Sequence, residues 1–247
     1  MRGIGVIGML ALGACGRLAF DPVTIESATN DATNDVNGPP MIARVQATTP
    51  AFLSSPGITR DMAVTVDNVV VAIAYWNNAG ATVAITDTSS HTWTATPRQS
   101  IPTGCNNNIG TNVQIFYAPI VRAGTTSILA AQSTGAEPLG LFTVEYSGIS
   151  TLDTQAGMIA PAASNAMTAG VVSTTGFDLI VAGFHDSVGS GTMQAGAGLT
   201  TLATDTISYA LFAEVIGPAG AYNINGTLPA GRNDACWVGT AAAFHAR

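Results

Sequence analysis

Two acidic residues could carry acid–base chemistry in this chain, because both lie in apolar segments where strands are expected. Glu145 and Glu214 are flanked by hydrophobic residues, and an unpaired carboxylate is costly to bury. Each must therefore face water or pair with an arginine such as Arg44, Arg98 or Arg122. On one concave face, about 5–5.5 Å or 6.5–9.5 Å apart, the two carboxylates would suit a retaining or an inverting glycosidase.

The sequence holds no other motif typical of a catalytic or metal site. It has no Gly-Xaa-Ser-Xaa-Gly segment, and it has no lysine with which to build a phosphate-binding P-loop. His91, His185 and His245 are far apart in the chain and lack the spacing of paired metal ligands. Asp186 follows His185, but neighbouring residues of a strand point to opposite faces. We therefore predict no metal ion and no cofactor.

Exposed aromatic side chains would offer a second kind of site, a platform for sugar rings. Trp76, Trp93 and Trp237 are the candidates, and Asn107 would add a side-chain amide. Aromatic residues are only 6% of the chain, and a sandwich of this size needs most of them in its core. These four positions are candidate ligand contacts, with core packing as the alternative for each tryptophan.

The N-terminal segment has the layout of a secretory signal peptide. The basic residue Arg2 precedes an apolar run at residues 4–12, and small residues follow. A membrane-spanning helix needs about 20 apolar residues, so this run is too short to be one. Residues 1–14 are therefore predicted to be removed on export.

The end of this segment, Leu12-Gly13-Ala14-Cys15, resembles a bacterial lipobox. The resemblance to bacterial lipoproteins implies cleavage before Cys15 and acylation of its thiol and amino group. Gly16, rather than an aspartate, comes next, which in Gram-negative lipoproteins implies the outer membrane, on its periplasmic or its surface side. An ordinary cleaved signal peptide with a chance cysteine is the alternative.

The remaining cysteines form a possible pair. If Cys15 is acylated, Cys105 and Cys236 are the only two left. An even number of cysteines in an oxidising compartment favours a disulfide. Two separate buried thiols are the alternative.

The charge balance narrows the choice of partners. The chain has 15 acidic and 8 basic residues, a formal net charge of −7 and no basic cluster. Nucleic acid is therefore not expected as a partner, because phosphate binding needs concentrated positive charge. For the same reason, the lipid rather than a protein surface is expected to contact the membrane.

Composition divides the mature chain into a tether and a folded domain. Residues 15–40 are polar and end in Gly38-Pro39-Pro40, which is typical of a flexible spacer. Residues 41–247 show short runs rich in Val, Ile, Thr, Tyr and Phe between Gly, Asn, Asp, Ser and Pro clusters, a pattern that predicts an all-β domain. The predicted strands are 68–76, 82–87, 91–96, 112–119, 125–132, 139–147, 177–185, 199–204, 207–216, 221–226 and 236–245.

The strand predicted at residues 68–76 shows how such a domain would pack. Its odd-numbered residues from 69 to 75 are all large and suit a sandwich core. Its even-numbered positions include two alanines, which suit a close neighbour such as a covering loop.

The domain also shows weak internal similarity. Residues 66–75 align with 175–184, and the order of later features agrees between residues 41–150 and 151–247. We therefore expect a pseudo-duplication whose halves face each other across one core, since neither half has much apolar area alone.

This duplication argues against a pair of catalytic acids. In the alignment Glu145 corresponds to Ala243, and Glu214 corresponds to Ala118. The two acids therefore belong to different strands of their halves. An enzyme is for this reason the less favoured reading.

Three short motifs resemble a jelly-roll-like β-sandwich module of bacterial secreted and surface proteins. They are the Asp-Xaa-Xaa-Xaa-His-Thr-Trp hairpin at residues 87–93, the turn at 122–126 and the segment 144–148. In the hairpin, Asp87 is expected to bond backbone two residues on. The resemblance covers residues 42–246 and implies a jelly-roll-like antiparallel sandwich of about 10–13 strands, but no catalytic residue.

The combined prediction is a lipid-anchored, outer-membrane β-sandwich that acts as a non-catalytic binding or adhesion module. A glycan or an envelope protein is its expected partner. The alternatives are a carbohydrate-binding or carbohydrate-active protein on the same fold, and a purely structural envelope component.

Overall fold

The computed structural model describes residues 41–78, 80–102, 110–135, 137–160, 163–188, 191–231 and 236–247. These residues belong to one compact unit, Pro39–Arg247. The predicted signal peptide at 1–14, the lipobox cysteine Cys15 and the tether lie outside the described residues, as do Cys105 and Asn107.

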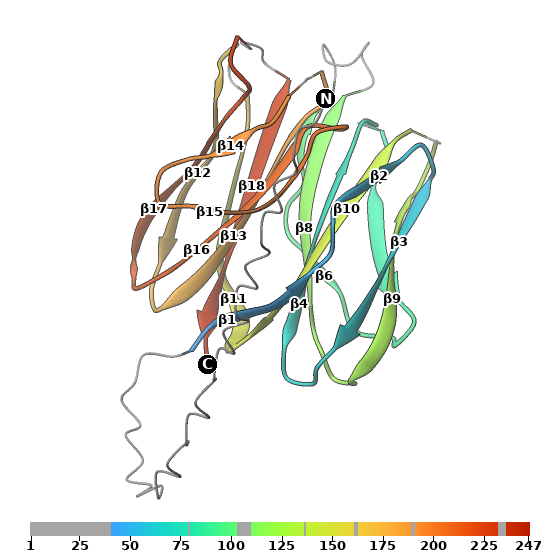
Figure 1. Ribbon diagram of the computed structural model, residues 1–247, viewed down its shortest axis with the longest axis vertical. Helices are drawn as coiled ribbons and strands as arrows, with labels where there is room; N and C mark the ends of the chain where they lie inside the picture. The colour runs from blue at the N-terminus through green and yellow to red at the C-terminus, as the bar shows by residue number, and fades with distance from the viewer. Residues whose placement is uncertain are drawn as a thin grey trace, which may run out of the picture. The chain divides into compact units, whose positions relative to one another are not determined.

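The described residues form an all-β structure in which every paired strand is antiparallel, as the sequence predicts (Figure 1). They contain no helix that is long and apolar enough to span a membrane. The first half holds β1 (Ala43–Ala47), β2 (Ala51–Leu53), β3 (Gly57–Val64), β4 (Val69–Trp76), β5 (Val83–Asp87), β6 (Thr94–Ala95), β7 (Gln99–Ile101), β8 (Thr111–Pro119), β9 (Gly124–Gln132) and β10 (Leu139–Ser147). The second half holds β11 (Ile149–Ile159), β12 (Ala166–Thr174), β13 (Asp178–Asp186), β14 (Gln194–Ala195), β15 (Thr200–Asp205), β16 (Ala210–Gly217), β17 (Gly220–Thr227) and β18 (Trp237–Ala246).

The described residues contain eighteen strands, more than the roughly 10–13 that the sequence predicts. The strands missed by the sequence pattern include β3, β11 and β12, which carry many Ser, Thr, Gly and Asp residues. In β3 and β12, buried residues alternate with more exposed ones along much of the strand, so these two strands cover a core with one face only.

Each half has two sheets, and the order of strands is the same in both halves. In the first half the sheet β1-β10-β4-β8-β6 is accompanied by β3-β9-β5. In the second half the sheet β11-β18-β13-β16-β15 is accompanied by β12-β17-β14. Strand by strand the two lists correspond, so the fold is an internal duplication. The jelly-roll winding stays a prediction from the sequence.

The strand register corrects the sequence alignment of the two halves by one residue. Val71 pairs with Val144 in the first half, and Val181 pairs with Ala242 at the same place in the second. Val71 is therefore equivalent to Val181, whereas the alignment had matched it with Ile180. Both strands are apolar on both faces, so hydrophobicity could not fix which side chains share a face.

The sheets lie in four layers, because the larger sheets of the two halves pack on each other and each is covered by its smaller sheet. Strand β4 contributes to two cores at once. Its side chains in the central core are Val69, Val71, Ile73 and Tyr75, and those in the outer core are Val70, Ala72, Ala74 and Trp76.

Two expectations about packing are correct only in part. The halves share the central core, but each also has a core of its own beneath its smaller sheet. The alanine face of β4 is covered by the sheet β3-β9-β5, through Ile58, Met62 and Ile128, and not by a loop. Small side chains on that face let a whole second sheet approach closely.

A glycine permits the closest approach between the halves. A Cβ atom on Gly183 of β13 would lie 2.8 Å from Cγ2 of Ile73 on β4. Gly183 and Ile73 occupy equivalent positions in their halves, since they pair with Thr240 and Phe142 respectively. One half thus supplies a bulky side chain where the other supplies the space.

A buried polar group also joins the halves. The Tyr75 hydroxyl donates to Oδ2 of Asp205, 2.7 Å away, and Ser208 donates to the same oxygen at 2.5 Å. Asp205 also caps the turn at 206–209, where Tyr209 has a φ of 52°. That turn delays the start of β16 to Ala210, three residues after the predicted start at 207.

The predicted turn after β5 forms, but it does not close a hairpin, because β5 pairs with β9 in the smaller sheet and β6 pairs with β8 in the larger one. Oδ1 of Asp87 accepts a hydrogen bond from the Ser89 N–H at 2.8 Å, two residues on. Its other oxygen accepts from Nε1 of Trp93 at 2.6 Å, and Nδ1 of His91 lies 3.1 Å from Oδ1. Burial raises the pKa of Asp87, but the hydrogen bonds from Trp93, His91 and Ser89 outweigh it and leave the pKa below its ordinary value.

Candidate functional site

The tryptophans proposed as a sugar platform serve the core instead. Trp76 and Trp237 are fully buried, in the outer cores of the first and second half. Trp93 is half-buried against the first outer core and is held by Asp87. The alternative of core packing is therefore correct for these three residues, and Asn107 lies outside the described residues.

Glu145 on β10 and Glu214 on β16 lie on opposite sides of the larger sheet of the first half. Glu145 points towards the outer core of the first half, where it accepts hydrogen bonds from Gln46 Nε2 (2.6 Å), the Thr65 N–H (2.8 Å) and Asn68 Nδ2 (2.7 Å). Its neighbour Tyr146 points the other way, into the central core. Glu145 is therefore sealed among neutral donors.

Glu214 lies on that other side, at the boundary between the halves. The Tyr146 hydroxyl donates to its Oε2 at 2.5 Å, and Nη1 of Arg44 lies 3.4 Å from its Oε1. Burial, together with the Glu214 carboxylate, raises the pKa of Tyr146 well above its ordinary value. With the sheet between them, Glu145 and Glu214 do not form the facing pair that glycoside hydrolysis needs.

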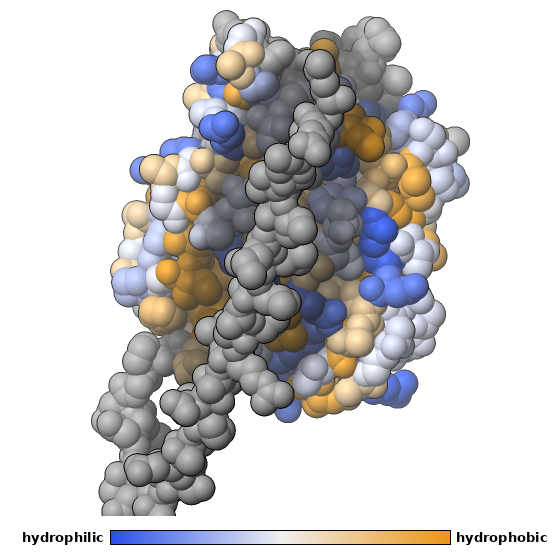
Figure 2. Space-filling view, viewed as in Figure 1, coloured by the Kyte–Doolittle hydropathy of each residue, from blue (hydrophilic) through white to orange (hydrophobic). Residues whose placement is uncertain are grey.

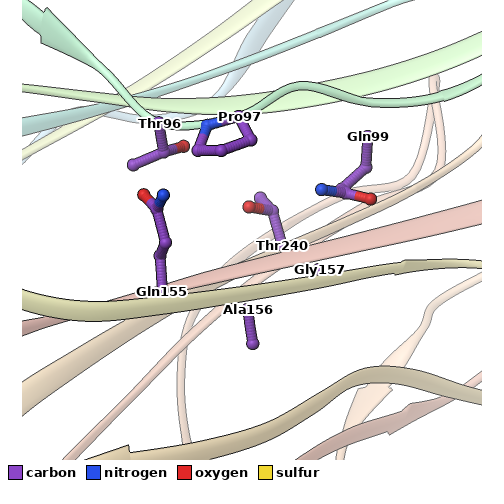
Figure 3. Close-up of a pocket in the computed structure, with 7 residues that line it drawn as sticks. All are labelled: Thr96, Pro97, Gln99, Gln155, Ala156, Gly157 and Thr240. Carbon is purple, nitrogen blue, oxygen red and sulfur yellow. The ribbon is translucent and has the colours of Figure 1, made fainter.

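A cavity of about 200 Å³ does lie where the two halves meet (Figure 3). The first half contributes the segment after β6 and strand β7, and the second half contributes β11 and β18. Its lining residues are Thr96, Pro97, Gln99, Gln155, Ala156, Gly157 and Thr240.

The lining of this junction pocket is polar but uncharged. Gln155 extends from β11 towards Thr96, and Gln99 and Thr240 lie beside it (Figure 3). Within the described parts of the chain, the side chains of Gln99, Gln155 and Thr240 form no hydrogen bond with another residue. Two amides and a hydroxyl thus remain free to bind a ligand that both donates and accepts hydrogen bonds.

Hydrogen bonds fix Thr96 on one side of the pocket, and a glycine makes room for Gln99 on the other. The Thr96 hydroxyl donates to the Ile115 carbonyl at 3.0 Å, and Gln114 Nε2 donates to the Thr96 carbonyl at 2.6 Å. A Cβ atom on Gly157 would lie 2.3 Å from Nε2 of Gln99. The absence of a side chain at Gly157 is therefore what lets the Gln99 amide reach the pocket.

A second set of polar side chains gathers at one end of the second half. Asp153 on β11, Asp178 at the start of β13 and His245 near the end of β18 each place a ligand-type atom within 4.8 Å of the others. Burial raises the pKa of Asp178 above its ordinary value despite its contact with His245. Hydrogen bonds from Thr175 hold the pKa of Asp153 below its ordinary value against the opposing effect of burial.

Sequence reasoning missed both of these groups, for different reasons. The pocket residues are neutral side chains on four separate segments, and no motif marks them. Asp153, Asp178 and His245 are spread over 93 positions of the chain, and only the pairing of β11 and β13 with β18 brings them together. The sequence pattern did not predict β11 as a strand, so it gave no signal that Asp153 lies beside His245.

Hydrophobic side chains on the surface do not single out another site. On the part of the face in Figure 2 that is not grey, hydrophobic and hydrophilic residues are interspersed. Scattered exposed apolar residues are normal on folded proteins.

No protein-family model, curated protein or solved structure matches this chain.

Proposed function

We propose that this chain is a lipid-anchored envelope protein whose duplicated β-sandwich is a non-catalytic binding module with its ligand in the junction pocket. The observation that supports this most directly is the pocket itself, which both halves line with amide and hydroxyl groups that have no hydrogen-bond partner among the described residues. A site at the seam between two rigid sandwiches is held in shape by both of them.

The chemistry of the lining favours a neutral, hydroxyl-rich ligand. None of the seven lining residues is charged, so an ionic group would lose hydration there without gaining a partner. Sugar hydroxyls donate and accept hydrogen bonds, as the glutamine amides do. A cavity of about 200 Å³ accommodates one terminal unit of a glycan rather than a long chain. The proposed partner is thus a neutral glycan of the envelope or of another cell.

Attachment to the outer membrane rests on the lipobox resemblance at residues 12–15. Several acyl chains contribute about 0.8 kcal/mol for each buried CH₂ group, which is enough for firm retention. Replacing Cys15 with serine should release the protein from the membrane fraction, as measured by fractionation and immunoblotting. Retention of the C15S protein would refute the lipid anchor and leave the pocket untouched.

The proposal also includes a disulfide between Cys105 and Cys236, supported by their even number after acylation and by the exported location. Mass spectrometry of peptides from alkylated, unreduced protein should recover the cross-linked pair. Recovery of two alkylated cysteines would show separate thiols instead.

The binding function is tested with the full chain in detergent on an array of neutral glycans. A positive glycan should then bind about two- to tenfold more weakly to Gln155→Ala, since one lost hydrogen bond contributes about 0.5–1.5 kcal/mol. Gly157→Ala should weaken binding similarly by displacing Gln99. Asn223→Ala, on an exposed position of β17 outside the pocket, is the control that should bind normally.

Equal binding by all three variants would place the ligand elsewhere on the protein. A blank array, together with normal folding, would favour a protein partner or a structural role over glycan binding.

A further inference from the structure

The group Asp153, Asp178 and His245 has the composition of a metal site. Nδ1 of His245 lies 2.9 Å from Oδ1 of Asp178, and Nε2 lies 3.4 Å from Oδ1 of Asp153. One imidazole thus contacts two carboxylates, on strands that are its neighbours in the sheet. Imidazole and carboxylate are common ligands of divalent transition metals.

One oxygen in this group has nothing to bind. Asp178 is only 1% exposed, and its Oδ2 is buried with no hydrogen-bond partner among the described residues. A buried carboxylate oxygen without a partner is costly, and such an atom in a folded protein calls for a missing ion or water. A cation bound by these side chains would supply the partner.

The equivalent position in the first half contains a buried carboxylate whose hydrogen bonds are satisfied. Asn68 and Ser147 stand at the positions equivalent to Asp178 and His245, given the register of β4 with β10 and of β13 with β18. There the buried carboxylate is Glu145, and neutral donors satisfy it. The second half has alanine in place of that glutamate, at Ala243, and metal-type ligands in place of the neutral residues.

The group is accessible and its ligands are held in place. The side chains of His245 and Asp153 are 36% and 12% exposed, which leaves a path for an ion and its water. The N–H of Thr175 donates to Asp153 Oδ2 at 3.1 Å, and its hydroxyl donates to Oδ1 at 3.4 Å. Hydrogen bonds of this kind orient the ligands of known metal sites.

We propose that Asp153, Asp178 and His245 bind one divalent transition-metal ion, with zinc the best match, at the end of the second half. Three protein ligands leave one position for water, as in zinc sites that are open to solvent. The ion would tie β11, β13 and β18 together where the sheet ends. This site is separate from the junction pocket and stands whether or not the pocket binds a glycan.

The test is zinc binding by the full chain after treatment with a chelator and alkylation of its thiols, so that cysteines cannot bind the metal. Calorimetry should show one saturable site, and the melting temperature should rise with zinc concentration, because ligand binding to the native state stabilises it. Asp178→Asn and His245→Ser, which introduce the residues of the first half, should each weaken binding at least tenfold.

Asp67→Asn is the matched control. It removes one exposed acid beside Asn68, so it lowers the negative charge by the same amount as Asp178→Asn without touching the group. Its zinc affinity should equal that of the unchanged protein. If H245S is unstable, the ring signals of His245 in nuclear magnetic resonance spectra of the unchanged protein provide a second measurement, since zinc should shift them and leave those of His91 in place.

Absence of saturable binding, or equal binding by D178N, H245S and D67N, would overturn the proposal. The group would then be a structural contact between one histidine ring and two carboxyl groups. In that case the two variants would lower stability to the same extent with and without zinc.

Discussion

The two halves share a strand order but stabilise equivalent places with different chemistry. In the first half, the Thr65 N–H donates to Glu145, a carboxylate of β10. In the second half the equivalent Thr175 N–H donates to Asp153, a carboxylate of β11. The same backbone donor thus finds an acidic partner on a different strand in each half.

The comparison shows that the fold leaves the same backbone N–H group in need of an acceptor in each half. Side chains from different strands can supply that acceptor. Glu145 is buried among uncharged donors, so that end of the first half is closed. Asp153 shares its surroundings with Asp178 and His245 and remains partly exposed. One half has thus acquired ionisable groups that the other lacks.

The largest expected effect on stability comes from removing the buried carboxylate of Glu145. Glu145→Ala removes the acceptor for the Thr65 N–H and for Asn68 Nδ2, and should lower the free energy of unfolding by about 3–5 kcal/mol. Glu145→Gln keeps an acceptor oxygen and should lose less. Urea denaturation measures both. A loss below about 1 kcal/mol for E145A would show that the carboxylate is not what closes this end.

The next effect concerns His185, which stands in β13 where the first half has Tyr75 in β4. Burial lowers the pKa of His185 from 6.5 to about 4. Between these two pH values the unfolded chain binds the proton more readily, so stability should fall as the pH drops from about 6.5 to 4, by about 3 kcal/mol in all. The lowered pKa values of Asp87 and Asp205 cause a further loss of stability only at lower pH, where these carboxylates become protonated.

Urea denaturation at a series of pH values measures this effect, with His185→Gln as the comparison. The glutamine can still donate to the Asn112 carbonyl, which lies 2.9 Å from Nδ1 of His185. H185Q should therefore lose the slope between pH 6.5 and 4. An unchanged slope would assign the pH dependence to other groups.

A moderate effect is expected where the halves touch most closely. Gly183→Ala would place a Cβ atom 2.8 Å from Ile73 and should cost about 1–3 kcal/mol, as overpacking of a core does. Made together with Ile73→Ala, the same change should cost at least about 1 kcal/mol less, because the clash is removed. Equal costs in both backgrounds would mean that the halves do not press on each other at this point.

The smallest effect concerns the turns after β5 and β14, each of which leads from the smaller sheet of its half to the larger one. In the first half the turn after β5 depends on the carboxylate of Asp87, whereas the turn after β14 is closed by a backbone bond from the Leu199 N–H to the Gly196 carbonyl, 3.2 Å long. Trp93→Phe removes the hydrogen bond to Asp87 and should cost about 1–2 kcal/mol, a few degrees in melting temperature. An unchanged melting temperature would show that backbone bonds alone suffice in this turn too.

Much of the architecture could be predicted from the sequence. Alternation and turn residues gave the position of β10 without error, and gave β4 and β8 within a residue. The repeat was correctly detected, and the turn chemistry of Asp87 was predicted correctly. These features depend on residues that are close in the chain, where propensity and spacing carry information.

What could not be predicted depends on contacts between distant segments. Strands with two apolar faces, such as β4 and β13, do not reveal their phase, so the equivalence of Val71 and Val181 was missed by one residue. The pocket needs Gln99 of the first half and Gln155 of the second to line the same cavity, and the metal-type group needs three strands in register. Burial of Trp76 and Trp237 follows from a second sheet on each side, which composition alone does not specify.

The central position of β18 has a consequence for how the molecule is made. This strand lies between β11 and β13, yet it comes after every other strand of its sheet in the chain. The first half has all its strands once Ser147 has been synthesised, but the second half must wait for Trp237–Ala246 with an open slot in its middle. A nascent or truncated chain that lacks this strand would expose two unpaired edges, which makes it a substrate for chaperones and proteases.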